Sequence, residues 1–118
     1  MTKLFLDDER DPSQWLPHMG WWRGSDPAEL AEWTWARTAP EAIEVLRMGD
    51  VVEVSLDHDL GDDPDVGTGY DVLAWLEEQV ALHGFEPPLI HVHTSNPSAR
   101  DRMEAAARAI EKLAARTS

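Results

Sequence analysis

The stretch that decides the fold begins with Val51-Val52-Glu53-Val54-Ser55-Leu56 and continues into Asp57-His58-Asp59. A short run rich in valine that ends in acidic residues is typical of a strand in a buried sheet. A helix signal follows, because Thr68-Gly69-Tyr70-Asp71 opens a segment that Gly84 can end. Within it the apolar residues recur at helical spacing: Val72, Leu73, Leu76 and Val80. The stretch therefore predicts a strand followed by a helix.

The same unit recurs on both sides of this stretch. Further apolar runs that predict strands lie at residues 4–6, 33–37 and 89–93. A capping box, Thr38-Ala39-Pro40-Glu41, begins a helix that Gly49 is placed to end, and Asn96-Pro97 begins the last helix. Strands that alternate with helices predict βαβ crossovers. We therefore expect an α/β fold of three layers, in which a parallel sheet of about four strands lies between helices.

Length and composition exclude several classes of protein. The 118 residues correspond to about one domain, over residues 1–118. Ten basic and 23 acidic side chains give a net charge of −13, which argues against binding duplex nucleic acid, because that requires a basic face. The lack of cysteine excludes disulfides and thiolate chemistry. Because no apolar run is long enough for a membrane span or a signal peptide, we expect a cytoplasmic protein that does not bind membranes.

Residues 13–31 are the least regular part of the sequence. Pro17, Gly20 and Gly24 favour a long connection in place of a full helix, with a short helix near Asp26-Pro27-Ala28-Glu29. Two adjacent indoles, Trp21-Trp22, lie in this connection. They either stack on a base or ribose, or cover the sheet face that a helix would otherwise cover.

Polar residues gather where three of the predicted strands end. Parallel strands bring their carboxyl ends to one edge of the sheet, so we expect these residues to meet there. Asp7, Asp8 and Asp57 would then repel one another unless a cation offsets their charge. Carboxylate oxygens suit Mg²⁺ or another hard divalent cation. We therefore expect these three aspartates to hold such an ion, if the protein uses one.

Two histidines occupy the same strand ends. His58 and His93 can act as general base and general acid on a phosphodiester, because imidazole titrates near neutrality. Asp59 or Asp57 can orient His58, and we count both carboxylates as candidate catalytic groups. His91 lies deeper in its strand and is expected to be structural.

The start of the last helix predicts an anion site at the same edge, because its free N–H groups and its dipole favour negative charge. The candidate phosphate-binding residues are Arg10, Thr94, Ser95, Asn96 and Arg100.

The sequence resembles receiver domains of response regulators. Leu4-Phe5-Leu6-Asp7-Asp8-Glu9 looks like their first strand, Leu56-Asp57 like their phospho-accepting strand, and Gly69-Tyr70-Asp71-Val72-Leu73 like the start of their next helix. More specifically, Ser55-Leu56-Asp57-His58-Asp59-Leu60-Gly61 and His93-Thr94-Ser95-Asn96-Pro97 resemble the cyclic-phosphate-processing receiver family. This resemblance covers nearly the whole chain.

The resemblance implies a flavodoxin-like fold and a site that acts on cyclic phosphates of nucleotides or nucleotide fragments. By position, Asp8 and Asp57 match the metal-binding acids of receivers, with Asp7 assisting. Asp57 also matches the phospho-acceptor, and Thr94 matches the hydroxyl residue at the end of the fourth strand. The last strand-helix unit of a full receiver, with its phosphate-contacting lysine, has no counterpart here, which puts phosphorelay switching in doubt.

We therefore expect a cyclic phosphodiesterase-type hydrolase whose partner is a small cyclic phosphate or nucleotide. One alternative is a phospho-accepting or pseudo-receiver signalling module. Another is a protein that sequesters a cyclic nucleotide, or an acidic decoy for a basic protein. The sequence points to no particular protein partner.

Overall fold

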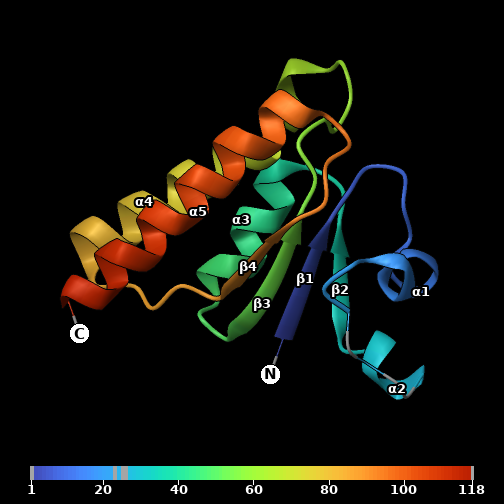
Figure 1. The fold of residues 1–118 in the computed structure, drawn as a ribbon, viewed down its shortest axis with the longest axis horizontal. Helices are drawn as coiled ribbons and strands as arrows, with labels where there is room; N and C mark the ends of the chain where they lie inside the picture. Colours follow the sequence, from blue (N-terminus) through green and yellow to red (C-terminus); the bar gives the residue numbers. More distant parts are fainter. Residues whose placement is uncertain (1, 23, 25–26, 118) are drawn as a thin grey trace.

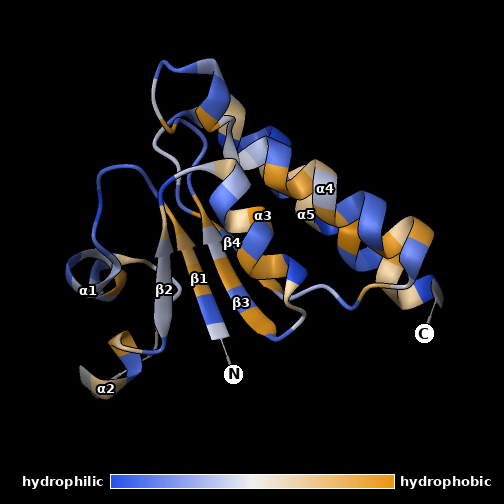
Figure 2. Ribbon diagram, turned by 180° about the vertical axis from the view of Figure 1, so that it is seen from behind, coloured by the Kyte–Doolittle hydropathy of each residue, from blue (hydrophilic) through white to orange (hydrophobic). Residues whose placement is uncertain are grey.

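In the computed structural model, which describes residues 2–22, 24 and 27–117, four parallel strands form one sheet. They are β1 (Thr2–Leu6), β2 (Trp33–Ala36), β3 (Val51–Leu56) and β4 (Leu89–Val92). Their order across the sheet is β2-β1-β3-β4. The sheet therefore has β1 and β3 at its centre, and Figure 2 shows hydrophobic residues along these two strands.

Three long helices cover one face of the sheet. They are α3 (Ala39–Arg47), α4 (Gly69–His83) and α5 (Pro97–Thr117). Their apolar faces pack against Leu4 and Leu6 of β1 and against Val54 and Leu56 of β3 in one buried cluster. Burial of this cluster stabilises the main core.

Short elements cover the other face: α1 (Pro12–Trp15), the 3₁₀ turn η1 (Leu16–His18) and α2 (Pro27–Leu30). In Figure 1, α1 and α2 lie on the side of the sheet away from α4 and α5. Phe5, which points away from Leu4 and Leu6, packs here with Leu16 and Trp33. The predicted three-layer α/β fold with a parallel sheet is confirmed.

The irregular connection acts as a cover for the sheet. The ring of Trp21 stacks on the ring of His91, with centroids 3.8 Å apart and planes 5° apart. Trp21 and Trp22 also pack against the cluster around Phe5 and Trp33. The sequence left two roles open for this pair of indoles, stacking on a ligand or covering the sheet face, and these contacts favour the second. The predicted short helix is α2, while Asp26 lies outside the described residues.

The helix ends confirm the predictions made from local motifs. At the start of α4, the Thr68 side chain accepts from the Asp71 backbone, and the Asp71 side chain accepts from the Thr68 backbone. Gly84 ends α4 in the left-handed conformation, with φ of 63°. The Asn96 side chain accepts from the Ala99 backbone at the start of α5. A further 3₁₀ turn, η2 (Pro64–Val66), precedes α4. Among the described helices, none has the length and apolar character needed to cross a membrane.

Gly69 lies where the start of α4 touches the end of β3. Its backbone N–H donates to the carbonyl of His58 at 3.2 Å. A Cβ at this position would overlap the backbone oxygen of Asp57 and lie 2.7 Å from Cε of Met103. Because a backbone oxygen cannot swing aside as a side chain can, only glycine allows this close approach.

We therefore expect Gly69→Ala to lower the free energy of unfolding by about 1–3 kcal/mol, through overpacking at a rigid contact. Gly20→Ala is the matched control, because a Cβ there meets nothing within 4 Å. Urea denaturation of the two variants and the parent measures the difference. Equal stability of both variants would contradict the proposed contact.

Candidate functional site

A cavity of about 460 Å³ lies at the carboxyl edge of the sheet. The ends of β1 and β3, the loop after β3 and one residue after β4 contribute to it. Its lining residues are Asp7, Asp8, Glu9, Arg10, Asp57, Asp59, Gly61, Asp62 and Ser95. Six carboxylates therefore face one guanidinium, and the cavity has a strong excess of negative charge.

Asp7 is the best-enclosed of these carboxylates and is held by three donors. Its Oδ1 accepts from the backbone N–H groups of Glu9 and Arg10, both at 2.9 Å. Its Oδ2 lies 3.1 Å from Nε2 of His93. Burial opposes ionisation, but the hydrogen bond with His93 and the two backbone donors outweigh it, so the pKa of Asp7 lies below its usual value. Asp7 is therefore held as a buried carboxylate.

His93 is enclosed beneath the cavity. Its side chain is 2% exposed, and its ring stacks on Phe5 with centroids 4.5 Å apart. Nδ1 lies 2.7 Å from Oγ of Ser55, and Nε2 faces Asp7. Because an ionised carboxylate can only accept, we assign the proton to Nε2, so that Nδ1 accepts from the Ser55 hydroxyl. A chain of hydrogen bonds thus runs from Ser55 through His93 to Asp7.

Ser55 is the member of this hydrogen-bond chain for which the sequence motifs predicted no role. It is fully buried in β3, beside Phe5 of β1 and His91 of β4 in the strand register. A lone hydroxyl within an apolar strand was the available signal, since a buried polar group needs a partner.

Asp57 directly follows β3, and its negative charge is less well compensated than that of Asp7. Its Oδ1 accepts from the backbone N–H of His58 at 2.8 Å. Burial and the nearby charge of Asp7 raise the pKa of Asp57, and this backbone hydrogen bond offsets them only in part. One ligand atom from each of Asp7, Asp57 and His93 falls in a group whose members all lie within 4.8 Å of one another.

This donor set fits a hard divalent cation. Nε2 of His93 is engaged by Asp7, so the ligands are better supplied by the carboxylates of Asp7 and Asp57, with Asp8 lining the same cavity. A cation would offset the repulsion that raises the pKa of Asp57. Oxygen ligands of this kind are those that Mg²⁺ prefers.

His58 is placed differently from His93. Nδ1 of His58 lies 2.8 Å from Oδ1 of Asp59, and the His58 side chain is 16% exposed. Of the two carboxylates considered for orienting His58, Asp59 therefore contacts its ring, and Asp57 contacts its backbone N–H. Asp59 lines the cavity, whereas neither imidazole is among the lining residues.

The candidate phosphate-binding residues divide into two groups. Arg10 and Ser95 line the cavity, and the Arg10 guanidinium lies 5.0 Å from the centre of the Trp15 ring. The others hold the turn between β4 and α5. Thr94 Oγ1 accepts from the backbone N–H of Asn96 at 3.2 Å, and Arg100 Nη2 donates to the carbonyl of Thr94 at 2.6 Å.

His91 contacts a glutamate of β3 and an indole of the sheet cover, as expected for a structural role. Its Nε2 lies 2.7 Å from Oε2 of Glu53, and its ring stacks on Trp21.

Comparison with known families matches residues 2–109 to the cyclic-phosphate processing Receiver domain. The chain belongs to this family. The same comparisons match it to no curated protein and to no solved structure. The suspected family is therefore confirmed over nearly the whole chain.

The features of this receiver domain agree with that membership. Acidic residues follow β1 and β3, which are adjacent in the sheet, and receiver domains commonly bind Mg²⁺ through acids of this kind. After β4, the described residues continue directly into α5, and no further strand follows there. The departure from a full receiver that the sequence predicted is therefore found within the described chain.

The buried carboxylate of Asp7 and the half-buried carboxylate of Asp57 have opposite effects on stability at neutral pH. The pKa of Asp7 is lowered by folding, so its ionised form stabilises the fold, and this contribution is lost as the pH falls through the folded-state pKa. The pKa of Asp57 is raised, so its ionised form destabilises the fold once the pH rises above that pKa. We therefore expect Asp57→Asn to raise the melting temperature at neutral pH without added metal, and Asp7→Asn to lower it. Each variant removes one negative charge, so each controls for the other; shifts of the same sign would contradict the assignment.

Added Mg²⁺ should raise the melting temperature of the parent protein, because a ligand that binds only the folded state stabilises it. The shift should be lost in Asp57→Asn and kept in Glu78→Gln, which removes a charge from an exposed position on α4. Thermal denaturation with MgCl₂ or with KCl of equal ionic strength separates binding from screening. An undiminished shift in Asp57→Asn would argue against carboxylate ligation.

Proposed function

We propose that this chain is a phosphohydrolase that opens a cyclic phosphate on a nucleotide or a nucleotide-derived small molecule. The observation that carries the proposal is the convergence of Asp7 and Asp57 on one cavity, above the buried Ser55–His93 pair. The cavity volume of about 460 Å³ suits a small ligand. Membership of a family described as processing cyclic phosphates supports the substrate class.

The reaction adds water to phosphorus and breaks one ring P–O bond. His58, oriented by Asp59, is the proposed proton-transfer group. It takes a proton from the attacking water and later releases it to solvent, while the ring oxygen that leaves takes a proton from solvent, so one water is added and the product is an open phosphate monoester. Each assisted proton transfer contributes about 10²–10⁴ in rate.

His93 is assigned a positioning role in place of direct proton exchange with substrate. Both of its ring nitrogens have protein partners, and its side chain is almost fully buried. It holds Asp7 in a fixed orientation and helps to keep it ionised. Asp7 in turn sets the charge that Asp57 experiences.

The phosphate group needs positive charge in this acidic cavity. Arg10 and Ser95 are the lining residues proposed to contact its oxygens, while Thr94, Asn96 and Arg100 shape the turn before α5. Mg²⁺, if held by Asp7, Asp8 and Asp57, would supply further positive charge against the phosphate oxygens.

The position of Asp57 also favours a second function, that of a phospho-accepting receiver. Asp57 lies at the end of β3 and lines the cavity, which is where the receiver resemblance puts the phospho-acceptor. In this alternative Asp57 takes a phosphoryl group from a small donor, and no cyclic phosphate is consumed.

A panel of cyclic nucleotides and smaller cyclic phosphates, followed by mass spectrometry with Mg²⁺ or with EDTA, tests the hydrolase. We expect addition of one water to at least one member, and a loss of about 10²-fold or more in His58→Ala. His83→Ala is the matched control, because His83 is exposed at the end of α4.

Unchanged turnover in His58→Ala would overturn the role given to that residue. Turnover of no cyclic phosphate, together with a labile phosphoryl adduct on Asp57 after incubation with acetyl phosphate, would favour the receiver alternative. Retention of an unaltered cyclic nucleotide would favour sequestration.

A further inference from the structure

The outer side of β4 carries backbone groups without partners among the described residues. Among the described residues, β4 pairs with β3 alone, and the backbone N–H of His93 donates to the carbonyl of Leu56 at 2.9 Å. In a parallel strand, the N–H and C=O groups of one residue point to the same side of the strand, and those of the next residue point to the other side. The backbone groups of His91 and His93 therefore face β3, and those of Ile90 and Val92 face the open edge. No hydrogen bond among the described residues uses those outward groups.

A groove runs beside this open edge. It has a volume of about 280 Å³ and is lined by Trp21, Ile90, His91, Val92, Glu104, Ala107, Arg108 and Glu111. Trp21, stacked on His91, forms one wall, and α5 forms the other. The unpaired strand edge therefore lies in a groove between Trp21 and α5.

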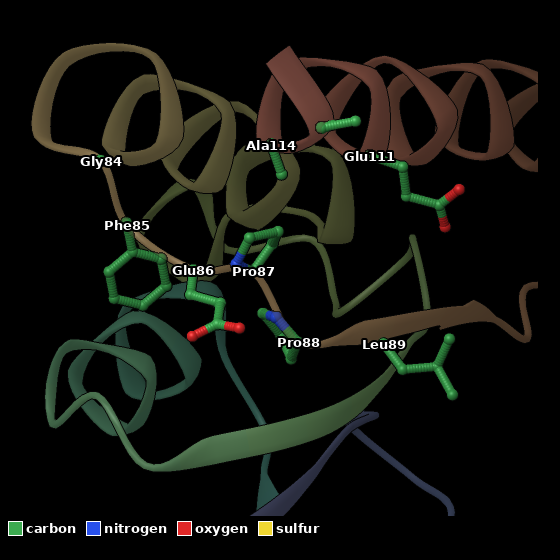
Figure 3. Close-up of a pocket in the computed structure, with 9 residues that line it drawn as sticks. Gly84, Phe85, Glu86, Pro87, Pro88, Leu89, Glu111 and Ala114 are labelled. Carbon is green, nitrogen blue, oxygen red and sulfur yellow. The ribbon is translucent and has the colours of Figure 1, made fainter. Parts of the chain in front are cut away.

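A larger cavity of about 730 Å³ lies at the amino end of β4. Glu111 lines both cavities, and the consecutive residues Leu89 and Ile90 line one each. Figure 3 shows Glu111 and Ala114 on α5 above the segment that carries Glu86 to Leu89. Leu89, at the start of β4, is 56% exposed. An extended segment that pairs with β4 would thus find apolar surface as well as backbone partners.

The charged side chains that line these two cavities favour a basic partner. Three glutamates, Glu86, Glu104 and Glu111, line the two cavities, against one arginine, Arg108. A second copy of this chain would bring the same acidic surface and a further net charge of −13, which opposes pairing between copies. A basic segment is attracted instead.

We propose that the open edge of β4 binds an extended, basic segment of another protein as an added strand. The main-chain groups of Ile90 and Val92 bind the backbone of the segment, as in other cases of β-strand addition. Glu86, Glu104 and Glu111 select lysine or arginine at alternate positions, and Leu89 contacts the apolar side chains between them. This surface lies outside the cyclic-phosphate cavity, and the proposal does not depend on the function proposed above.

The test uses a fluorescent synthetic peptide of alternating lysine and valine. We expect binding by fluorescence anisotropy, with amide NMR shifts and slowed exchange centred on Ile90 and Val92. A peptide of alternating glutamate and valine should bind at least about ten-fold more weakly than the basic peptide. The double variant Glu104→Gln/Glu111→Gln should weaken binding of the basic peptide several-fold. The matched control Glu77→Gln/Glu78→Gln removes the same charge from exposed positions on α4 and should not weaken it.

Methylated peptides test strand pairing directly. N-methylation of alternate residues removes the N–H groups on one side of an extended peptide, so only one of the two alternate sets should abolish binding. Equal effects of both sets, no binding, or shifts centred on Asp7 and Asp57 would overturn the proposal. Self-association of the chain with the same amide shifts in the absence of peptide would also overturn it, in favour of a second copy as the occupant.

Discussion

The hydrogen bond between His93 and Asp7 is the interaction on which the candidate site depends. A carboxylate as enclosed as Asp7 is costly to ionise unless donors replace the water it loses. The imidazole supplies one donor, and the loop after β1 turns back to supply the N–H groups of Glu9 and Arg10. This arrangement joins the ends of β1 and β4 across β3, so the carboxyl edge of the sheet is organised around one buried charge.

Aromatic rings on the sheet face opposite the long helices contact the polar site directly. Phe5 stacks on His93, and Trp21 stacks on His91, two residues earlier in the sequence. The indole N–H of Trp35 donates to the carbonyl of Asp7 at 2.8 Å. These rings exclude water from the Ser55–His93–Asp7 chain, which strengthens its electrostatic interactions. Trp21 belongs to the segment that replaces a full helix on this face, whereas the contact with Asp7 is made by Trp35 of β2.

Two regions of the sheet edge have different chemical character. The carboxyl edge gathers six carboxylates around a polar cavity, where burial and mutual repulsion raise the pKa of Asp57. The open side of β4 offers main-chain groups beside an apolar and acidic groove. The first is the region proposed to hold a cation and a small phosphate, and the second is the region proposed to bind a polypeptide. Because His93 directly follows β4 and bonds to Asp7, the same part of the chain contributes to both regions.

Local patterns in the sequence predicted the strands, the parallel sheet, the caps at Thr68 and Asn96 and the meeting of acids at one edge. They succeeded because strand periodicity, capping and turn chemistry depend on residues close together in the chain. The tertiary structure decided the setting of His93, the part played by Ser55 and the stacking of Trp21. The partners of His93 lie 38 and 86 residues away in sequence. Whether such atoms meet depends on strand register and on which face each side chain takes, and these are set only when the layers pack together.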